Sequence, residues 1–280
     1  MINKKQAYKT LLKSWFFTIL GFISVIGLFI LISIVLRKYG AYRIIFSSFL
    51  ILGIINLIVF FFNELLVVKL YNGIRIEQNE QYKILIENIR KLCKGRLLLR
   101  VPRIYLLEMN SPNACAFGWG FFGQYAMGFS PEIIKKLSEK ELTAVAAHEL
   151  AHIMHLDVGI NTALSFSSNY ATILAFRVMK FGGILTGPLG WTIALGLWLI
   201  GRIIKFLFYL ISQEREIAAD TLGCLYVNNS VDLAEALKKI SSGKKSFNKE
   251  ESYFKDIMIS HPHMDERSES LKQLESFNIN

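Results

Sequence analysis

The stretch TAVAAHELAHIMHLD, residues 143–157, holds three of the five histidines in the chain. Within it, His148, Glu149 and His152 form the pattern H-E-x-x-H. Residues i and i+4 of an α-helix lie on one face, so both imidazoles can reach the same ion. Zinc in catalytic sites takes three protein ligands and a water whose proton a neighbouring carboxylate can accept. The pattern also arises by chance in unrelated proteins, so it needs support from elsewhere in the chain.

The helix expected here has its own start signal. Ser138 and Glu141, three residues apart, form a capping box in which each side chain satisfies a free backbone N–H. We expect this helix to run to about His155. Residues 103–110 are typical of a strand, and residues 114–129 of two strands joined by a glycine turn.

A further helix is expected at residues 77–95, where charged and apolar residues alternate at helical spacing. One face of that helix is expected to carry Ile84, Leu85, Ile89 and Leu92.

A third ligand is available in ISQEREIAAD, residues 211–220. Glu216 and Asp220 again share a helical face, so Glu216 could complete a zinc site. Asp220 could then accept the free ring N–H of a histidine ligand and hold its orientation. Taken alone, this spacing is equally typical of a charged surface helix.

Two long uncharged runs indicate a membrane protein. Residues 15–36 and 44–62 are each long enough to span a bilayer core of about 30 Å. The first run is too long for a secretory signal peptide, and a second follows it closely. Two less clear apolar segments, residues 160–179 and 184–200, lie between the two halves of the expected metal site. They must cross the membrane together or not at all, and we favour a hairpin that crosses twice.

The basic residues predict the orientation. Four lysines precede the first run and many basic residues follow the second, which places both flanks in the cytoplasm. The net charge of +10 is explained by such flanks beside anionic lipid, and we expect no nucleic-acid partner. The three cysteines are far apart and are expected to be reduced thiols.

Together, these segments resemble the HtpX / CAAX-prenyl-protease family of membrane zinc endopeptidases. The resemblance rests on HELAH followed by EREIAAD, on the two N-terminal runs, on NACAFG at residues 113–118 and on SHPHMDERSESL at residues 260–271. The order of the motifs is closer to HtpX than to the prenyl-processing branch.

The resemblance implies a role for each motif residue. It implies one Zn²⁺ per chain held by His148, His152 and Glu216, with Glu149 as general base and Asp220 behind the ligands. It further implies that a strand beside the cleft pairs with an extended substrate. This strand is formed by Asn113, Ala114, Cys115 and Ala116. His261 is expected to stabilise the oxyanion, although a turn histidine before Pro262 is an equal alternative.

Three other residues of these segments have weaker claims. His155 and His263 are expected at the surface, and Asp157 is expected to brace the end of the H-E-x-x-H helix.

The expected fold is mainly α with a small β-sheet, in a multi-pass membrane protein with a cytoplasmic zincin-like catalytic domain. Residues 1–66 would hold two transmembrane helices and residues 159–210 a further transmembrane hairpin. Residues 67–158 and 211–280 would form the two parts of the catalytic domain.

The expected function is a zinc metalloendopeptidase of the cell membrane with its active site facing the cytoplasm. The resemblance implies stress-response quality control, with membrane or misfolded proteins as substrates. Two alternatives remain open: an intramembrane protease, disfavoured by the polar SEKE before the motif, and a non-enzymatic multi-pass protein with a fortuitous H-E-x-x-H.

Overall fold

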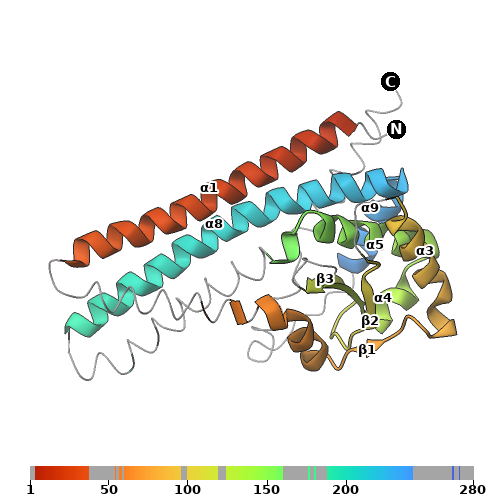
Figure 1. The fold of residues 1–280 in the computed structure, drawn as a ribbon, viewed down its shortest axis with the longest axis horizontal. Coiled ribbons are helices and arrows are strands. Elements are labelled where there is room, and N and C mark those ends of the chain that lie inside the picture. The colour runs from red at the N-terminus through yellow and green to blue at the C-terminus, as the bar shows by residue number, and fades with distance from the viewer. Residues whose placement is uncertain are drawn as a thin grey trace. The chain divides into compact units, whose positions relative to one another are not determined.

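The computed structural model describes residues 4–37, 60–95, 100–118, 124–159 and 188–241, with isolated positions that include Arg267 and Leu271. Contacts divide the chain into two compact units. The first unit comprises residues 1–13, 61–160 and 213–280, and the second comprises residues 14–60 and 161–212. Figure 1 shows the order of the elements along the chain.

The first unit contains a four-stranded mixed sheet with the order β1-β2-β4-β3. The strands are β1 (Ile74–Arg75), β2 (Arg103–Leu106), β3 (Ala114–Gly118) and β4 (Tyr125–Phe129). β4 runs parallel to β2 and antiparallel to β3, so the expected hairpin is present and β3 forms one edge of the sheet. The strand expected at residues 103–110 ends earlier, at Leu106, because Met109 donates its N–H back to Leu107 in a turn.

The helices of the first unit that pack with these strands include α3 (Lys83–Cys93), α4 (Pro131–Lys136), α5 (Glu139–Met154) and α9 (Val231–Ser241), with the short helix η1 (Glu80–Tyr82) before α3. Their buried faces form one core with the strands. α5 begins with the expected capping box at Ser138 and Glu141, and ends one residue before His155. The mainly helical fold with a small sheet is therefore confirmed.

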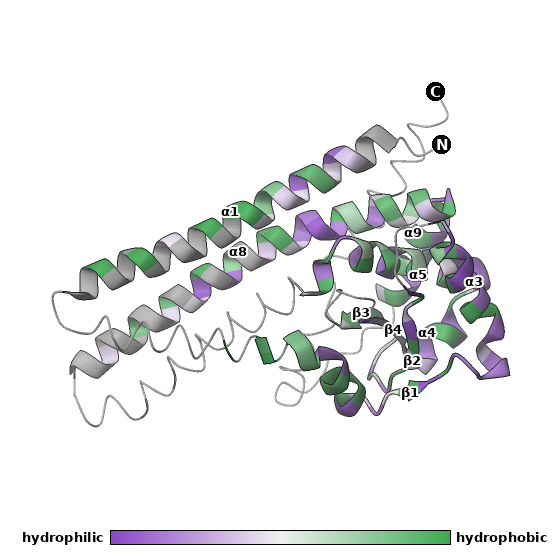
Figure 2. Cartoon of the chain, in the orientation of Figure 1, coloured by the Kyte–Doolittle hydropathy of each residue, from purple (hydrophilic) through white to green (hydrophobic). Residues whose placement is uncertain are grey.

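The expected apolar face of α3 was wrong at one position. Ile84 is 59 % exposed, whereas Leu85, Ile89 and Leu92 are buried as expected. Ile86 and Cys93 complete the buried face instead, because they follow Leu85 and Leu92 on the side turned toward the core. The outer side of α3 carries the polar residues coloured purple in Figure 2.

Two long helices carry the apolar segments. α1 (Lys4–Arg37) contains the first apolar run, and α8 (Pro188–Val227) joins part of the 184–200 segment to the EREIAAD motif. Pro188 stands at the first position of α8, where its missing N–H is not needed. Among the described residues, we find no helix both long enough and apolar enough to cross a membrane. Most of the 44–62 run and of the 160–179 segment lies outside the described residues.

Candidate metal centre

α5 carries both histidines of the motif and the glutamate between them. His148, Glu149 and His152 are all buried, with 3 %, 2 % and 4 % of their surfaces exposed. The helix can bury them because the stretch around them, residues 144–153, is otherwise apolar and packs into the core of the first unit. The two imidazole rings lie edge to face, and their Nε2 atoms are 3.1 Å apart.

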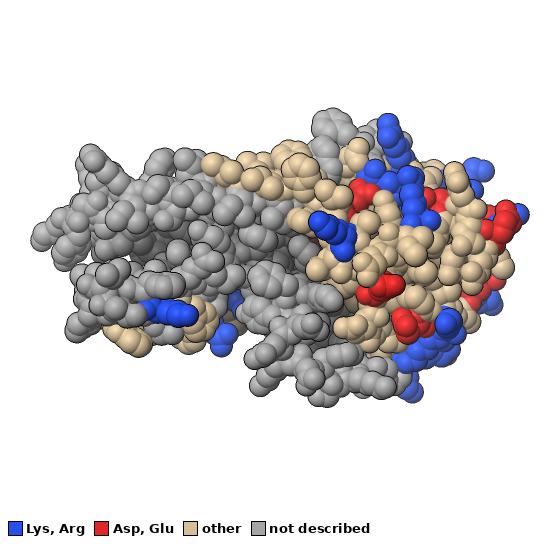
Figure 3. Space-filling view, turned by 90° about the horizontal axis from the view of Figure 1, so that it is seen from below, with Lys and Arg blue, Asp and Glu red and all other residues tan. Residues whose placement is uncertain are grey.

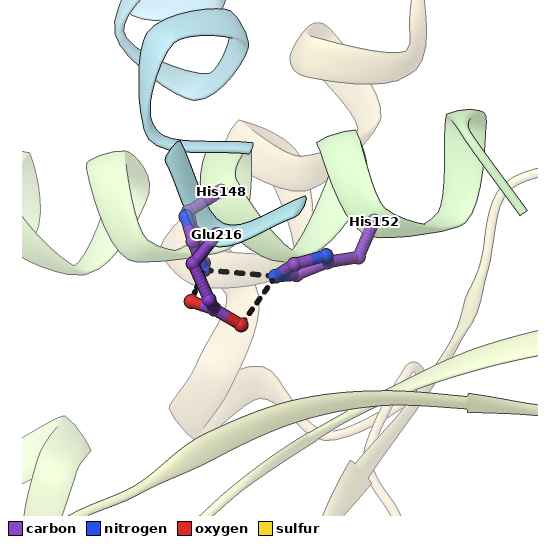
Figure 4. A group of neighbouring side chains, drawn as sticks. All are labelled: His148, His152 and Glu216. Carbon is purple, nitrogen blue, oxygen red and sulfur yellow. Dashed lines mark hydrogen bonds and ion pairs between the residues drawn. The ribbon is translucent and has the colours of Figure 1, made fainter. Parts of the chain in front are cut away.

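Glu216 on α8 meets these histidines. Its carboxylate oxygens lie 3.5 Å from Nε2 of His148 and 3.4 Å from Nε2 of His152. One potential ligand atom from each residue lies within 4.8 Å of the other two. Figure 4 shows the three side chains pointing toward one another. Among the described residues, this is the group whose donors converge in that way. Two imidazoles and one carboxylate form a donor set typical of catalytic zinc, so the residues present fit that ion.

Asp220 and Arg267 support His148. Oδ1 of Asp220 lies 3.0 Å from Nδ1 of His148, whereas Glu216 lies at the other ring nitrogen, Nε2. Arg267 donates two hydrogen bonds to the Asp220 carboxylate, at 2.8 and 2.6 Å, and also lies 2.7 Å from Glu216. Burial alone would raise the pKa of Asp220, but the charge and hydrogen bonds of Arg267 outweigh it and lower this pKa to about 2. Asp220 therefore stays ionised beside the histidine.

Asp157 and Arg215 support His152 in the same manner. Oδ2 of Asp157 lies 2.8 Å from Nδ1 of His152, and its other oxygen contacts the Arg215 guanidinium. Both residues are almost fully buried. Burial works against a charged His152, but the carboxylate of Glu216 outweighs it and raises the pKa of His152.

The edge strand β3 lies beside Glu149. α5 packs against β3, and Cys115, the second residue of that strand, is buried. Burial raises the pKa of the Cys115 thiol well above its ordinary value, and the nearby Glu149 carboxylate raises it further. The strand expected to bind substrate and the expected general base are therefore neighbours.

The backbone of β3 offers hydrogen-bonding groups at its free edge. The N–H of Ser130 donates to the carbonyl of Asn113. The main-chain N–H and C=O groups of odd-numbered residues in this strand therefore face β4, and those of even-numbered residues face the outer edge of the sheet. Consistently, the Gly118 N–H donates a hydrogen bond to the side-chain oxygen of Asn63, and the Ala114 N–H donates one to the side-chain oxygen of Asn113. The N–H and carbonyl of Ala116 thus point to the outer edge.

Not every sequence expectation can be placed in the structure. His261 and His263 lie outside the described residues. His155 was expected at the surface, and this was wrong: it is half-buried where the chain leaves α5, and burial lowers its pKa to about 4. Asp157 was expected to brace the helix end, and its carboxylate contacts His152 in the last turn of α5, in agreement with that expectation.

Sequence reasoning also missed residues at the site. Arg267 lies in SHPHMDERSESL, residues 260–271, one of the stretches that carry the family resemblance, and the sequence assigned it no role. Arg215 directly precedes Glu216. The residues around it are mostly polar, so nothing in the sequence indicated that Arg215 would be buried. Gly223 had no signal, although its backbone packs against that of His148.

Comparison with known proteins identifies the family. The model of "Peptidase family M48" matches residues 84–275, a range that contains every residue of the site. The chain belongs to peptidase family M48. The expected resemblance to HtpX is confirmed by curated relatives with that name.

Two relatives named "Protease HtpX homolog" illustrate the similarity. That of Burkholderia cenocepacia (strain HI2424) is 32 % identical over 191 residues, which is 66 % of this chain and 65 % of the relative. That of Burkholderia mallei (strain SAVP1) is 30 % identical over 233 residues, or 81 % of this chain and 79 % of the relative. This M48 chain thus spans slightly less than two thirds of the first relative's length. No solved structure matches it.

Proposed function

We propose that this M48 chain is a membrane-anchored zinc metalloendopeptidase. The observation that carries the proposal is the buried convergence of His148, His152 and Glu216, with Glu149 in the same helix. Ionisable groups are rarely buried in such number unless they are paired or bind a metal. The residue types and the family point to the same chemistry.

Three residues would hold one Zn²⁺ per chain. His148 and His152 would bind through Nε2, because the Nδ1 atom of each faces an aspartate. Glu216 would supply a carboxylate oxygen as the third ligand. Zinc, when bound, acts as a Lewis acid that polarises a carbonyl and lowers the pKa of water toward about 7.

Glu149 would move the proton during hydrolysis. Its position next to His148 on α5 allows its carboxylate to take a proton from water and pass it to the leaving amine. His261, outside the described residues, is proposed to donate a hydrogen bond to the developing oxyanion. Arg267, six residues later in the same segment, lies at the site and supports this placement.

The substrate would bind as an extended chain along β3, the strand that includes Asn113, Ala114, Cys115 and Ala116. Addition of a strand at a sheet edge uses main-chain hydrogen bonds and demands little of the substrate sequence. Unfolded segments of membrane or misfolded proteins are therefore the proposed substrate class.

The membrane part of the proposal rests on the sequence. The apolar runs at residues 15–36 and 44–62, within the proposed anchor 1–66, favour two spans with the catalytic parts in the cytoplasm. Residues 159–210 would form the second hairpin between the catalytic parts 67–158 and 211–280. Figure 3 shows that the charged part of the described surface is mixed, with Lys and Arg beside Asp and Glu.

Metal analysis of the detergent-purified chain tests the central assignment. We expect one zinc per chain, and loss of most of it in His152→Ala and in Glu216→Ala. Asp232→Asn on α9 is the matched control, since its carboxylate binds Asn229 away from the site. Zinc below one tenth of an equivalent in the wild-type chain after reconstitution would overturn the proposal.

A further inference from the structure

The chain turns sharply between α5 and Asp157. The N–H of His155 donates to the carbonyl of Ala151 and that of Leu156 to Ile153, which ends the helix. Leu156 then adopts a φ of +59°, in the left-handed region that a leucine rarely occupies. Such a backbone persists only where the surrounding contacts require it, and it is found often at functional sites.

The result of this turn is the placement of Asp157. Asp157 is only 2 % exposed, and its Oδ2 atom lies 2.8 Å from Nδ1 of His152. Its second oxygen contacts Arg215, the largest of the fully buried side chains, which is only 1 % exposed. Arg215 also donates to the carbonyl of His155 at 3.4 Å. One arginine therefore binds both the turn and the carboxylate that the turn presents.

These contacts connect two candidate ligands from different helices. Arg215 is the residue before Glu216 on α8, while Asp157 contacts His152 on α5. Glu216 is bonded in sequence to Arg215, Arg215 contacts Asp157, and Asp157 contacts His152. A 3.4 Å contact between Glu216 and Nε2 of His152 completes this ring of contacts. We propose that Asp157 and Arg215 are a positioning pair that holds His152 with Nδ1 toward the carboxylate and Nε2 toward the metal.

The pair has a defined physical effect on His152. A carboxylate at Nδ1 favours the tautomer with the proton on that atom and leaves the Nε2 lone pair for an ion. Its negative charge makes the imidazole a better ligand. Arg215 compensates that charge and fixes the carboxylate, because a buried lone aspartate would be strongly disfavoured. Asp220 likewise lies at Nδ1 of His148 and is paired with Arg267. Arg267 differs from Arg215 in that it also lies close to Glu216 and to Nε2 of His148.

This inference rests on the proposed function, and a merely structural role is the alternative. In that alternative, Asp157 and Arg215 only join α5 to α8, and any neutral pair of similar shape would serve. Asp157→Asn and the double variant Asp157→Asn/Arg215→Gln separate the two roles. The single variant leaves a buried arginine without its partner, whereas the double variant leaves two amides that can bond to each other.

The experiment measures the zinc dissociation constant of the detergent-purified full chain by competition with a chromophoric chelator. Thermal unfolding of the metal-free protein and the visible absorption of the Co²⁺-loaded protein are recorded in parallel. For a positioning pair, both variants bind zinc about 10- to 100-fold more weakly and show an altered Co²⁺ spectrum. The double variant regains the thermal stability that the single variant loses, but it does not regain zinc affinity.

Other outcomes overturn the inference in distinguishable ways. Wild-type zinc affinity and an unchanged Co²⁺ spectrum in the folded double variant would show that the pair is only a structural link. Weak binding in the control Asp232→Asn, which alters a carboxylate that accepts a hydrogen bond from Asn229, would show that the effect is not specific. A wild-type chain that binds no zinc would overturn the proposed function together with this inference.

Discussion

Gly223 on α8 packs backbone to backbone against His148 on α5. A Cβ added at Gly223 would lie 2.9 Å from both the N and the Cα of His148. The two helices can therefore approach only because this residue has no side chain. The close approach brings Asp220, one turn earlier on α8, within reach of the His148 ring.

Gly223→Ala is expected to separate these helices. Alanine normally favours a helix over glycine by up to about 1 kcal/mol, but here it would meet backbone atoms that cannot move aside. We expect a net loss of about 1–3 kcal/mol in unfolding free energy and at least tenfold weaker zinc binding. Gly27→Ala on α1 is the matched control, since its added Cβ would meet no described atom within 4 Å. Zinc affinity in Gly223→Ala equal to that of Gly27→Ala would contradict this account.

Arg267→Gln is expected to make the fold depend on metal. Without the guanidinium, the buried carboxylates of Asp220 and Glu216 lose a shared partner, and breaking such a network costs about 3–5 kcal/mol. Bound zinc would restore part of this stability, because it binds the folded state alone. Thermal unfolding with and without zinc should show a larger zinc-induced rise in midpoint than in wild type. Arg75→Gln, at an exposed position, should behave like wild type; an equal rise in Arg267→Gln would count against the network.

His155 is expected to make stability pH-dependent below neutrality. Burial lowers its pKa from the ordinary 6.5 to about 4, so between these values the unfolded chain binds a proton that the folded chain does not. Stability should therefore fall as the pH falls from 6.5 toward 4, by at most about 3 kcal/mol from this group. Urea unfolding of the metal-free protein at pH 7 and pH 5 measures the effect. His155→Gln should lose less stability between these two pH values; an unchanged loss would exclude this origin.

Ala116→Pro tests the edge strand. Its N–H faces away from β4, and proline is tolerated at such edge positions, so the fold and zinc content should be kept. A substrate strand that pairs with β3 would lose one main-chain hydrogen bond and meet the proline ring. We expect kcat/KM for peptide substrates to fall about tenfold, which is the effect of about 1.4 kcal/mol. Unchanged kcat/KM in this variant would mean that substrates do not bind along this edge.

Local rules in the sequence predicted the elements that carry the site. The capping box at Ser138 predicted the start of α5, and the i,i+4 spacing predicted which side chains share a face. The meeting of Glu216 with the histidines was anticipated only from chemistry and resemblance, because no local rule brings α8 to α5.

The remaining contacts depend on tertiary structure. Asp157 reaches His152 only because Leu156 adopts a left-handed conformation, for which a leucine gives no sequence signal. Arg215 and Arg267 looked like ordinary charged residues, and only their burial shows that each one neutralises a carboxylate at the site. Ile84 was misplaced because α3 is short and follows directly after a 3₁₀ turn. Its apolar stripe is broad, and the periodicity of the sequence alone does not define where that stripe ends.

The most direct test of the account is Glu149→Gln in the detergent-purified chain, with zinc content and cleavage of an unfolded protein measured on the same sample. Glutamine keeps the size of Glu149 but cannot accept the proton, and Glu80→Gln, at an exposed position, is the control. The account predicts one zinc per chain in all three proteins and cleavage that is about 10²- to 10⁴-fold slower in Glu149→Gln alone. Undiminished cleavage by zinc-loaded Glu149→Gln would contradict it.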